Sequence, residues 1–435
     1  MSKLYRVVML VLASVFSLVM SVSAASNVTV VADATLIDIP LSQAQAIGLP
    51  SAPIANDRGI LLGGIGSDLY HSAGAPADEF WAVTDRGPNS EIEVAGEVRY
   101  TALTPEFTPT IVQLKIANGV ATPMTYVPIV TSTGKPVTGL PNIDGPDPLF
   151  WDATAANKLA FNPNGLDVEG LVRTKNGEFW VVEEYRPSLV HISAAGKVIA
   201  RYVPKGVSLV GADYPVIEAL PAAYAQRKGN RGFEGMTISK DEKTIFIVLQ
   251  SPLSAPDKST GDRSRTTRIV KFDVSSATVT GEYAYRQEIS TLFNPRAKMK
   301  QTEMKLSGVA AIDGENLLVL ERTDWAFAVY RVNLSNATNI AGSVWSTSNA
   351  PTSLEFFAEP SDVSVVPVSK SLLFHSSELT NMPEKVEGLT IIDNTTLAIA
   401  NDNDFDVGTV DAAGNNKGSG KKCRVIVLKV ADITK

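Results

Sequence analysis

The sequence predicts an all-β fold, a β-propeller of five or six blades with loop insertions. The first observation behind this prediction is a repeat. Residues 165–193, GLDVEGLVRTKNGEFWVVEEYRPSLVHIS, return in altered form at 232–251, 305–324, 385–404 and, more degenerately, at 63–89. Each copy has an acid or serine, a glycine, an apolar run, a polar turn and a second apolar run that ends in polar residues. The second observation is that no stretch keeps a helical period over many residues.

The glycine that marks each copy gives the period of the repeat. It is Gly170, Gly235, Gly308 and Gly388, at intervals of 65, 73 and 80 residues. These intervals are long for a solenoid, but they fit four-stranded propeller blades that carry inserted loops. A glycine directly after the acid lets the backbone approach a neighbour where a Cβ would clash, as crowding near a propeller axis demands.

The first residues of the chain have the pattern of a secretory signal. Lys3 and Arg6 give a positive end, residues 7–20 an apolar core, and residues 22–24 a small-residue cleavage site. The core is shorter than the roughly 20 apolar residues that a membrane anchor needs. We therefore expect a signal peptide at 1–24, a single domain at 25–435, no stable membrane insertion, and export to a bacterial periplasm or the exterior.

Composition narrows the class of partner. The single cysteine, Cys423, has no second cysteine for an internal disulfide, so the core alone must hold the exported domain. The formal net charge of −7 argues against a nucleic-acid partner, which usually requires a basic face. The same charge is compatible with cation binding. The sequence leaves the oligomeric state open.

Expected strands follow the chain in sets of four. A strand at 27–39 lies outside the repeat, and we expect it to pair with 423–430 and close the ring, which protects the edges of a blade. Residues 131–163 are expected to form a surface loop and 214–227 a helix. The expected blade strands are 59–64, 79–84, 111–116 and 124–130; 168–173, 178–183, 189–192 and 198–203; 233–239, 244–250, 268–274 and 279–285; 306–312, 316–321, 327–332 and 340–345. Strands at 362–366 and 371–375 then precede the fifth copy at 386–400, and a sixth blade from 351–375 stays open.

Acidic residues recur at one place in the repeat. Glu169, Glu234 and Glu387 directly precede marker glycines, and Ser307 takes this place in the fourth copy. A carboxylate among apolar strand residues is costly unless it is paired or bound to a metal. In the structural interpretation these glutamates join blades by accepting hydrogen bonds from backbone N–H groups or by pairing with arginines, namely Arg86, Arg186, Arg231 and Arg322. In the functional one, some of them line a central metal and substrate site.

The second strand of each copy ends in polar residues, and superposable repeats place these ends on one rim. Oxygen ligands alone suit calcium, whereas zinc prefers His or Cys, and the three histidines lack ligand spacing. Arginines beside the acids can bind phosphate or carboxylate groups. The catalytic candidates are Glu169, Glu183, Glu234, Arg86, Arg186 and Arg322. The metal-ligand candidates are Asp85, Glu184, Glu387, Asp402 and Asp404.

Two further patterns bear on the chemistry. Residues 402–408, DNDFDVG, alternate acids as a calcium loop does, but the glycine lies one place later than in an EF-hand. No G-x-S-x-G elbow is present, so nothing in the sequence favours a serine nucleophile.

The copies together resemble a known family. DRGPN, GLDVEGLVRTKNGEFWVVEEYRPSLVHIS, NRGFEGMTIS, LSGVAAID and KVEGLTIIDNTTLAIANDNDF look like the family called esterase-like activity of phytase, or phytase-like, over residues 57–430. The resemblance implies a β-propeller and hydrolysis of phosphate or carboxylic esters. This chain departs from the pattern at Ser307 and in the polar loop after Asp402.

These observations support two functional expectations. The first is an exported, metal-dependent hydrolase of phosphoesters such as phytate, with calcium as cofactor and a small anionic ester as substrate. The alternative is a non-catalytic propeller that binds a ligand or protein on its loop-rich face, since a fold alone does not specify chemistry.

Overall fold

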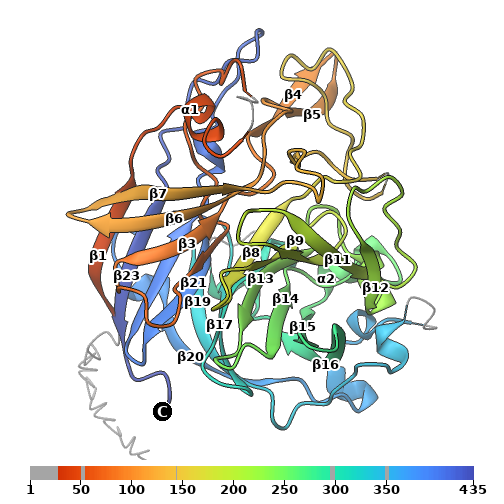
Figure 1. Cartoon of the computed structure of the whole chain (residues 1–435). Helices are drawn as coiled ribbons and strands as arrows, with labels where there is room; N and C mark the ends of the chain where they lie inside the picture. The colour runs from red at the N-terminus through yellow and green to blue at the C-terminus, as the bar shows by residue number, and fades with distance from the viewer. Residues whose placement is uncertain (1–27, 50–53, 144, 294–298, 348–351) are drawn as a thin grey trace, which may run out of the picture.

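The computed structural model describes residues 28–49, 54–143, 145–293, 299–347 and 352–435, and these form a five-bladed β-propeller (Figure 1). The expected signal peptide at 1–24 lies outside the described residues. The innermost strands of the blades are β2, β8, β13, β17 and β21, and each contacts the next around the axis until β21 meets β2. The predicted fold class is confirmed.

Every blade has four antiparallel strands that run from the axis outward. Blade 1 contains β2 (Asp68–Tyr70), β3 (Glu79–Val83), β6 (Thr110–Ala117) and β7 (Val120–Pro128). Blade 2 contains β8 (Val168–Arg173), β9 (Phe179–Glu183), β10 (Ser188–Ile192) and β11 (Val198–Pro204), with β12 (Val216–Leu220) added outside. Blade 3 contains β13 (Phe233–Ile238), β14 (Thr244–Leu249), β15 (Thr266–Asp273) and β16 (Thr278–Arg286). Blade 4 contains β17 (Lys305–Ala311), β18 (Asn316–Arg322), β19 (Phe327–Asn333) and β20 (Ser369–His375). Blade 5 contains β21 (Val386–Asp393), β22 (Thr396–Asn401), β23 (Arg424–Val430) and β1 (Val28–Leu36).

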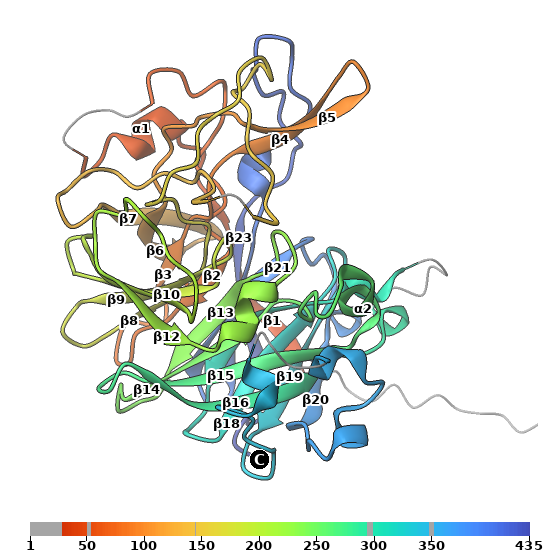
Figure 2. The same ribbon diagram turned by 90° about the vertical axis from the view of Figure 1, so that its right-hand side faces the viewer.

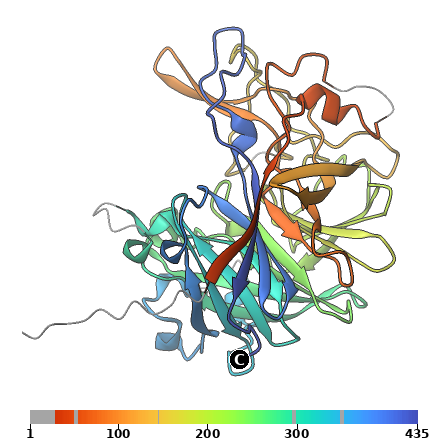
Figure 3. The same cartoon turned by 90° about the vertical axis from the view of Figure 1, so that its left-hand side faces the viewer.

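The ring closes through the N-terminal strand, as the sequence predicts. β1 pairs antiparallel with β23, from Val28 opposite Val430 to Thr35 opposite Arg424. Figure 3 shows the red N-terminal strand crossing beside the blue C-terminal one. β1 also pairs in parallel with β7, so blades 1 and 5 share one continuous sheet. The edges of both blades are thereby covered.

The marker glycines lie where neighbouring inner strands approach most closely. A Cβ on Gly235 would stand 1.9 Å from the carbonyl oxygen of Ser307 in the next blade. A Cβ on Gly308 would stand 2.5 Å from the Cβ of Leu389. This confirms the expected crowding at the axis, and it explains why glycine occupies these positions.

Three predicted elements are wrong. Residues 340–345 form no strand, because the fourth strand of blade 4 is β20, reached after a long excursion with short 3₁₀ turns at Val344–Ser346, Leu354–Phe356 and Pro360–Val363. The proposed strand at 362–366 lies in that excursion, so residues 351–375 make no sixth blade. The predicted helix at 214–227 is instead β12, parallel to β11, followed by a 3₁₀ turn at Ala222–Gln226. Sheet pairing at the blade edge outweighs the weak local preference of the apolar run.

The inner strand of blade 1 also differs from the prediction. It is β2 rather than residues 59–64, which lead into it. The loop insertions gather at the end of the ring where the inner strands begin. They include α1 (Leu41–Gln45), the hairpin of β4 (Asn89–Val94) with β5 (Glu97–Ala102), and the loop after Asp404, all above the ring in Figures 1 and 2. Among the described helices, none combines the length and apolarity that crossing a membrane requires.

Candidate functional site

The three repeat-related glutamates converge on the propeller axis. Glu169, Glu234 and Glu387 lie in β8, β13 and β21, each one residue before a marker glycine. Their carboxylate oxygens lie within 4.8 Å of one another. Equivalent positions in superposable blades point to one centre, which explains this convergence. The prediction that these acids share an environment is therefore confirmed.

A second acidic group adjoins the first through Glu169. Asp85, which follows β3, and Asp167, which precedes β8, have carboxylate oxygens within 4.8 Å of each other and of Glu169. We call the five residues of both groups the axial acid cluster: Asp85, Asp167, Glu169, Glu234 and Glu387. Glu184 lies at its border, buried, and accepts a hydrogen bond of 2.9 Å from Gln250 Nε2.

Two arginines neutralise part of the axial acid cluster and join its blades. Arg322 of blade 4 forms ion pairs with Glu387 of blade 5 and, at 3.5 Å, with Glu234 of blade 3. Its Nε donates to the hydroxyl of Ser307 over 2.8 Å. Arg86 of blade 1 forms an ion pair of 2.9 Å with Asp167 of blade 2. Glu234 and Glu387 thus pair with an arginine that joins their blades, as the structural interpretation of the repeat predicts.

Glu169 differs from the other two glutamates. Within the described ranges, no Lys or Arg lies at ion-pair distance from its carboxylate, and the residue is only 9% exposed. Its carboxylate lies within 4.8 Å of those of Asp85 and Asp167. Burial, followed by the charges of Asp167 and Glu234, raises the pKa of Glu169 well above its ordinary value. An ionised Glu169 therefore requires a cation that the side chains around it do not supply.

Burial also raises the pKa values of three neighbouring acids. Burial, followed by the charge of Asp402, raises the pKa of Asp85. Burial and the charge of Glu234 raise the pKa of Glu184. Burial raises the pKa of Glu387 to about 8, even though Arg322 opposes the shift. Each of these carboxyls is stabilised by a proton or by a bound cation.

The donor set of the axial acid cluster fits a hard divalent cation. It offers only carboxylate oxygens, the ligands that calcium takes in numbers of about six to eight. The histidines lie in other contacts: His71 Nε2 meets the carbonyl of Pro76, and His191 meets Glu178. His375 Nδ1 lies 2.8 Å from the hydroxyl of Ser377. A zinc site with nitrogen ligands does not match this arrangement.

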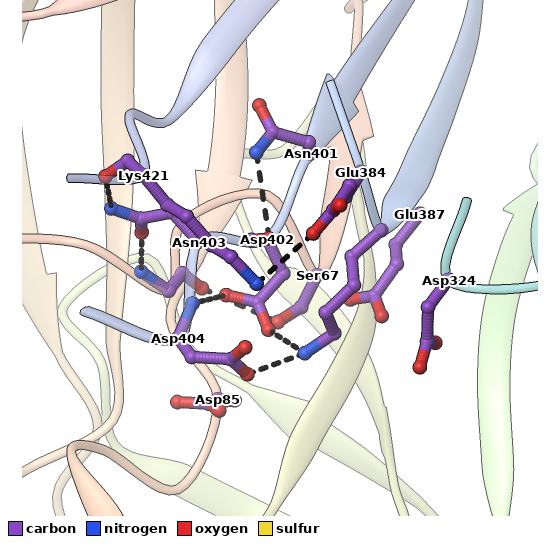
Figure 4. Close-up of polar contacts among 12 residues, drawn as sticks. Ser67, Asp85, Asp324, Glu384, Glu387, Asn401, Asp402, Asn403, Asp404 and Lys421 are labelled. Carbon is purple, nitrogen blue, oxygen red and sulfur yellow. Dashed lines mark hydrogen bonds and ion pairs between the residues drawn. The ribbon is translucent and has the colours of Figure 1, made fainter. Parts of the chain in front are cut away.

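The calcium-loop interpretation of residues 402–408 is not what the structure shows. Lys385 Nζ forms ion pairs with Asp402, at 2.7 Å, and with Asp404. Figure 4 marks both ion pairs as dashed lines from the labelled carboxylates of Asp402 and Asp404. Asp406 instead accepts hydrogen bonds from the backbone N–H groups of Ser419 and Lys421. The three acids diverge and two of them are neutralised by a lysine, so they do not surround one cation.

Two other predicted site residues lie apart from the axial acid cluster. Glu183 is fully buried and accepts hydrogen bonds from the backbone N–H groups of Tyr185 and Arg186 and from the Ser188 hydroxyl. It also forms an ion pair with the buried Arg201. The side chain of Arg186 lies against Gly145. These contacts brace the β9–β10 turn of blade 2 and give Glu183 a structural role.

Sequence reasoning missed several residues at the site. Asp167, Lys305 and Lys385 each lie three residues before a marker glycine, and this shared column of the repeat could have identified them. Asp68 in β2 is also buried on the axis, where it accepts hydrogen bonds from the backbone N–H groups of Leu69 and Leu171. No repeat position identifies Asp68, because the first copy is the most degenerate.

A cavity lies at the opposite end of the axis, where the inner strands end. It has a volume of about 430 Å³ and is lined by residues such as Arg173, Ile238, Ala311 and Ile391. None of its lining residues belongs to the axial acid cluster. The axis of the ring therefore has two chemically different ends, and the carboxylates occupy the end below the loop insertions.

Comparison with known proteins gives one family match. The family model described as phytase-like, esterase-like activity of phytase, matches residues 60–405. A protein of Arthroderma benhamiae described as an uncharacterized secreted protein is 26% identical over 275 residues, which cover 54% of this chain and 54% of that protein. The chain thus spans about half the length of this relative.

Solved structures with a similar course of the chain are distant. Pseudomonas fluorescens PhoX in complex with vanadate is 9% identical, with a TM-score of 0.39 over 94% of this chain and 97% of that one. The PQQ-bound aldose sugar dehydrogenase of Streptomyces coelicolor is 9% identical, with a TM-score of 0.33 over 86% of this chain and 96% of that one. Likenesses at this level carry no argument about chemistry.

Proposed function

This chain belongs to the phytase-like family, and we propose that it is an exported hydrolase that cleaves phosphoesters, such as phytate, or related esters. The reaction takes place at the axial acid cluster and depends on a divalent cation, with calcium as the first candidate. The description of the Arthroderma benhamiae relative as secreted supports export, as does the leader-like pattern of residues 1–24.

The observation that carries this proposal is the environment of Glu169. Its carboxylate lies between Asp85 and Asp167 on one side and Glu234 and Glu387 on the other. Arg322 and Arg86 pair with the acids around it but not with Glu169. If the acids only joined blades through these ion pairs, the buried charge of Glu169 would stay uncompensated, at a cost of several kcal/mol. A cation held by Asp85, Asp167 and Glu169 removes that cost.

The residues around the axis would have two roles in such a site, cation binding and the positioning of the acids. Asp85, Asp167 and Glu169 would hold the cation, which supplies positive charge to the ester oxygens when it is bound. Arg322 fixes the positions of Glu234 and Glu387 by ion pairs. Gln250 Nε2 donates hydrogen bonds to both Glu184 and Glu234, and so holds the acids of blades 2 and 3 in register.

A substrate screen with and without calcium tests the proposed function. Purified protein is assayed on p-nitrophenyl phosphate and on p-nitrophenyl acetate, first with a chelator and then after calcium is restored. We expect turnover that the chelator removes and calcium recovers. Absence of turnover on both esters, with calcium bound, would instead favour a non-catalytic propeller that binds its ligand below the loop insertions.

A further inference from the structure

Four positive side chains of blades 3, 4 and 5 lie at the same end of the ring as the axial acid cluster. Arg231 precedes β13, Lys305 opens β17, Arg322 ends β18 and Lys385 precedes β21. We call these four residues the cationic rim. They come from blades 3, 4 and 5, whereas Asp85, Asp167 and Glu169 come from blades 1 and 2. Blades 3 and 5 also carry Glu234 and Glu387, so this end of the axis combines carboxylates from four blades with cations concentrated in blades 3 to 5.

The four residues of the cationic rim differ in how fully carboxylates neutralise their charges. Arg322 and Lys385 are compensated by the acids described above. Lys305 lies 2.9 Å from Asp324, but this carboxylate also lies 3.1 Å from Arg322. One acid is thus shared by two cations.

Arg231 has no carboxylate partner at all among the described residues. Its Nη1 donates to the Ser251 hydroxyl over 3.0 Å and to the carbonyl of Thr302 over 3.3 Å, and both acceptors are neutral. Ser251 directly follows Gln250, the residue that donates to Glu184 and Glu234. The charges of Glu184 and Glu234 also act on the Arg231 guanidinium and oppose the lowering of its pKa by burial, although neither carboxylate forms an ion pair with it.

Electrostatic repulsion within the cationic rim points to an anion. Burial, followed by the charges of Arg322 and Arg231, lowers the pKa of Lys305 to about 8. Burial lowers the pKa of Arg231 as well, and Arg322 adds to this effect against the opposing charge of Glu184. An anion bound between Arg231 and Lys305 would offset the repulsion between these two positive charges. The guanidinium group of an arginine binds two oxygens of a phosphate at once.

We propose that Arg231 and Lys305 form the subsite for the anionic group of the ester. This inference rests on the proposed function and specifies its substrate class. The preferred substrate is a phosphomonoester, whose dianion meets Arg231 and Lys305 on one side and the cation held by the axial acid cluster on the other. A neutral carboxylic ester lacks the charge that these two residues recognise.

Titration with inorganic phosphate tests the subsite without any turnover. Calorimetry on the calcium-loaded protein compares wild type with Arg231→Gln and Lys305→Gln. Loss of a charge-assisted hydrogen bond should raise the Kd of phosphate about tenfold or more in each variant. Lys243→Gln is the matched control, because Lys243 is exposed and pairs at 3.7 Å only with Asp241. An equal Kd in all four proteins overturns the proposal.

Two further comparisons separate binding from folding and from catalysis. Arg231→Lys and Lys305→Arg keep the charge and should recover at least part of the phosphate affinity, which a merely structural role does not predict. In turnover, Arg231→Gln should lower kcat/KM for p-nitrophenyl phosphate about tenfold and leave that for p-nitrophenyl acetate within about twofold. Equal losses on both esters would contradict the subsite. If neither ester is hydrolysed, the proposed function fails, and the phosphate titration still decides the subsite.

Discussion

Among individual residues, Glu169 has the least compensated charge on the axis. Glu234 and Glu387 share Arg322, and Asp167 has Arg86, whereas Glu169 has only the neighbouring carboxyl of Asp167. Four acidic neighbours raise its pKa in addition to burial. Ionisation of Glu169 and binding of a cation are therefore coupled, because a metal ligand must give up its proton.

Replacing Glu169 with glutamine should separate the charge of this side chain from its volume. We expect Glu169→Gln to be at least as stable as wild type without calcium, since a costly buried charge is removed. Its affinity for calcium should fall roughly tenfold or more, because one charged ligand is lost. Thermal melts with calcium and with chelator measure both effects. A calcium-induced shift in Tm equal to that of wild type would contradict the assignment.

Glu183→Gln is the matched control, since Glu183 is equally buried but lies in a different network. Its carboxylate accepts hydrogen bonds from two backbone N–H groups and a hydroxyl, and pairs with Arg201. Loss of this charged acceptor should cost about 1–3 kcal/mol of unfolding free energy. The calcium-induced shift in Tm should stay unchanged, because Glu183 lies outside the axial acid cluster.

Stability should depend on pH in a direction set by the raised pKa values. Burial moves the pKa of Glu387 from 4.5 to about 8 in the folded protein. Between these two values the folded state binds more protons than the unfolded state, so the unfolding free energy falls as pH rises. The calcium-induced rise in Tm should grow over the same range, because calcium replaces protons. Melts at pH 5, 6.5 and 8 test this, and a calcium effect that is as large at pH 5 as at pH 8 would oppose it.

The sequence predicts that these glutamates lie close together, but it does not predict which of them form ion pairs. The repeat column before the marker glycines predicts that Glu169, Glu234 and Glu387 meet. It does not show that Arg322 reaches two of them, because that arginine comes from the second strand of another blade. Likewise, Glu183 and Glu184 are adjacent in sequence, but successive side chains of a strand point in opposite directions. Glu183 therefore contacts Arg201, whereas Glu184 contacts Gln250.

At the scale of the element, β1 holds the ring together. It pairs with β23 on one side and with β7 on the other, and so links the first and last blades. The sequence predicts the pairing with β23 from the two β-rich ends of the chain, but not its antiparallel direction. The parallel pairing with β7 could not be predicted, because it depends on how the closed ring brings blade 1 against blade 5. The long excursion before β20 was misread for a similar reason, since only pairing with β19 identifies the true fourth strand.

Removal of β1 should expose the edges of β23 and β7 and cause self-association. We expect a protein that lacks Val28–Leu36 to elute as oligomers or aggregates in size-exclusion chromatography with light scattering. As a control, the β4–β5 hairpin is shortened by replacing residues 93–98 with an Asn-Gly turn, which leaves Ile92 opposite Arg99. This control should keep the wild-type elution. An unaltered elution and Tm after loss of β1 would place the closure elsewhere.

A Cβ between two inner strands should destabilise the ring. In Gly235→Ala, the new methyl group would meet the carbonyl oxygen of Ser307, and overpacking of this kind costs about 1–3 kcal/mol. Gly314→Ala is the control, because nothing lies within 4 Å of a Cβ at that position. Its effect should stay within about 0.5 kcal/mol. Equal denaturation midpoints for the two variants would show that the axis tolerates the extra atom.

At the scale of the whole molecule, the five blades bring together charges that lie far apart in the sequence. Blades 1 and 2 contribute Asp85, Asp167 and Glu169, and blades 3 to 5 contribute the cationic rim. The loop insertions stand above this end of the axis, and the cavity of about 430 Å³ lies at the other. The fold class followed from the repeat, but the grouping of these charges at one end of the axis required the order of the blades in space.

The central claim is that the axial acid cluster binds a divalent cation through Glu169. A crystal structure of the protein grown with calcium, with the cation located by its anomalous scattering, tests this most directly. We expect calcium at about 2.3–2.6 Å from carboxylate oxygens of Glu169 and Asp167, and of Asp85 or Glu234. An axis without calcium, with Glu169 bound to an arginine or to water alone, would contradict it.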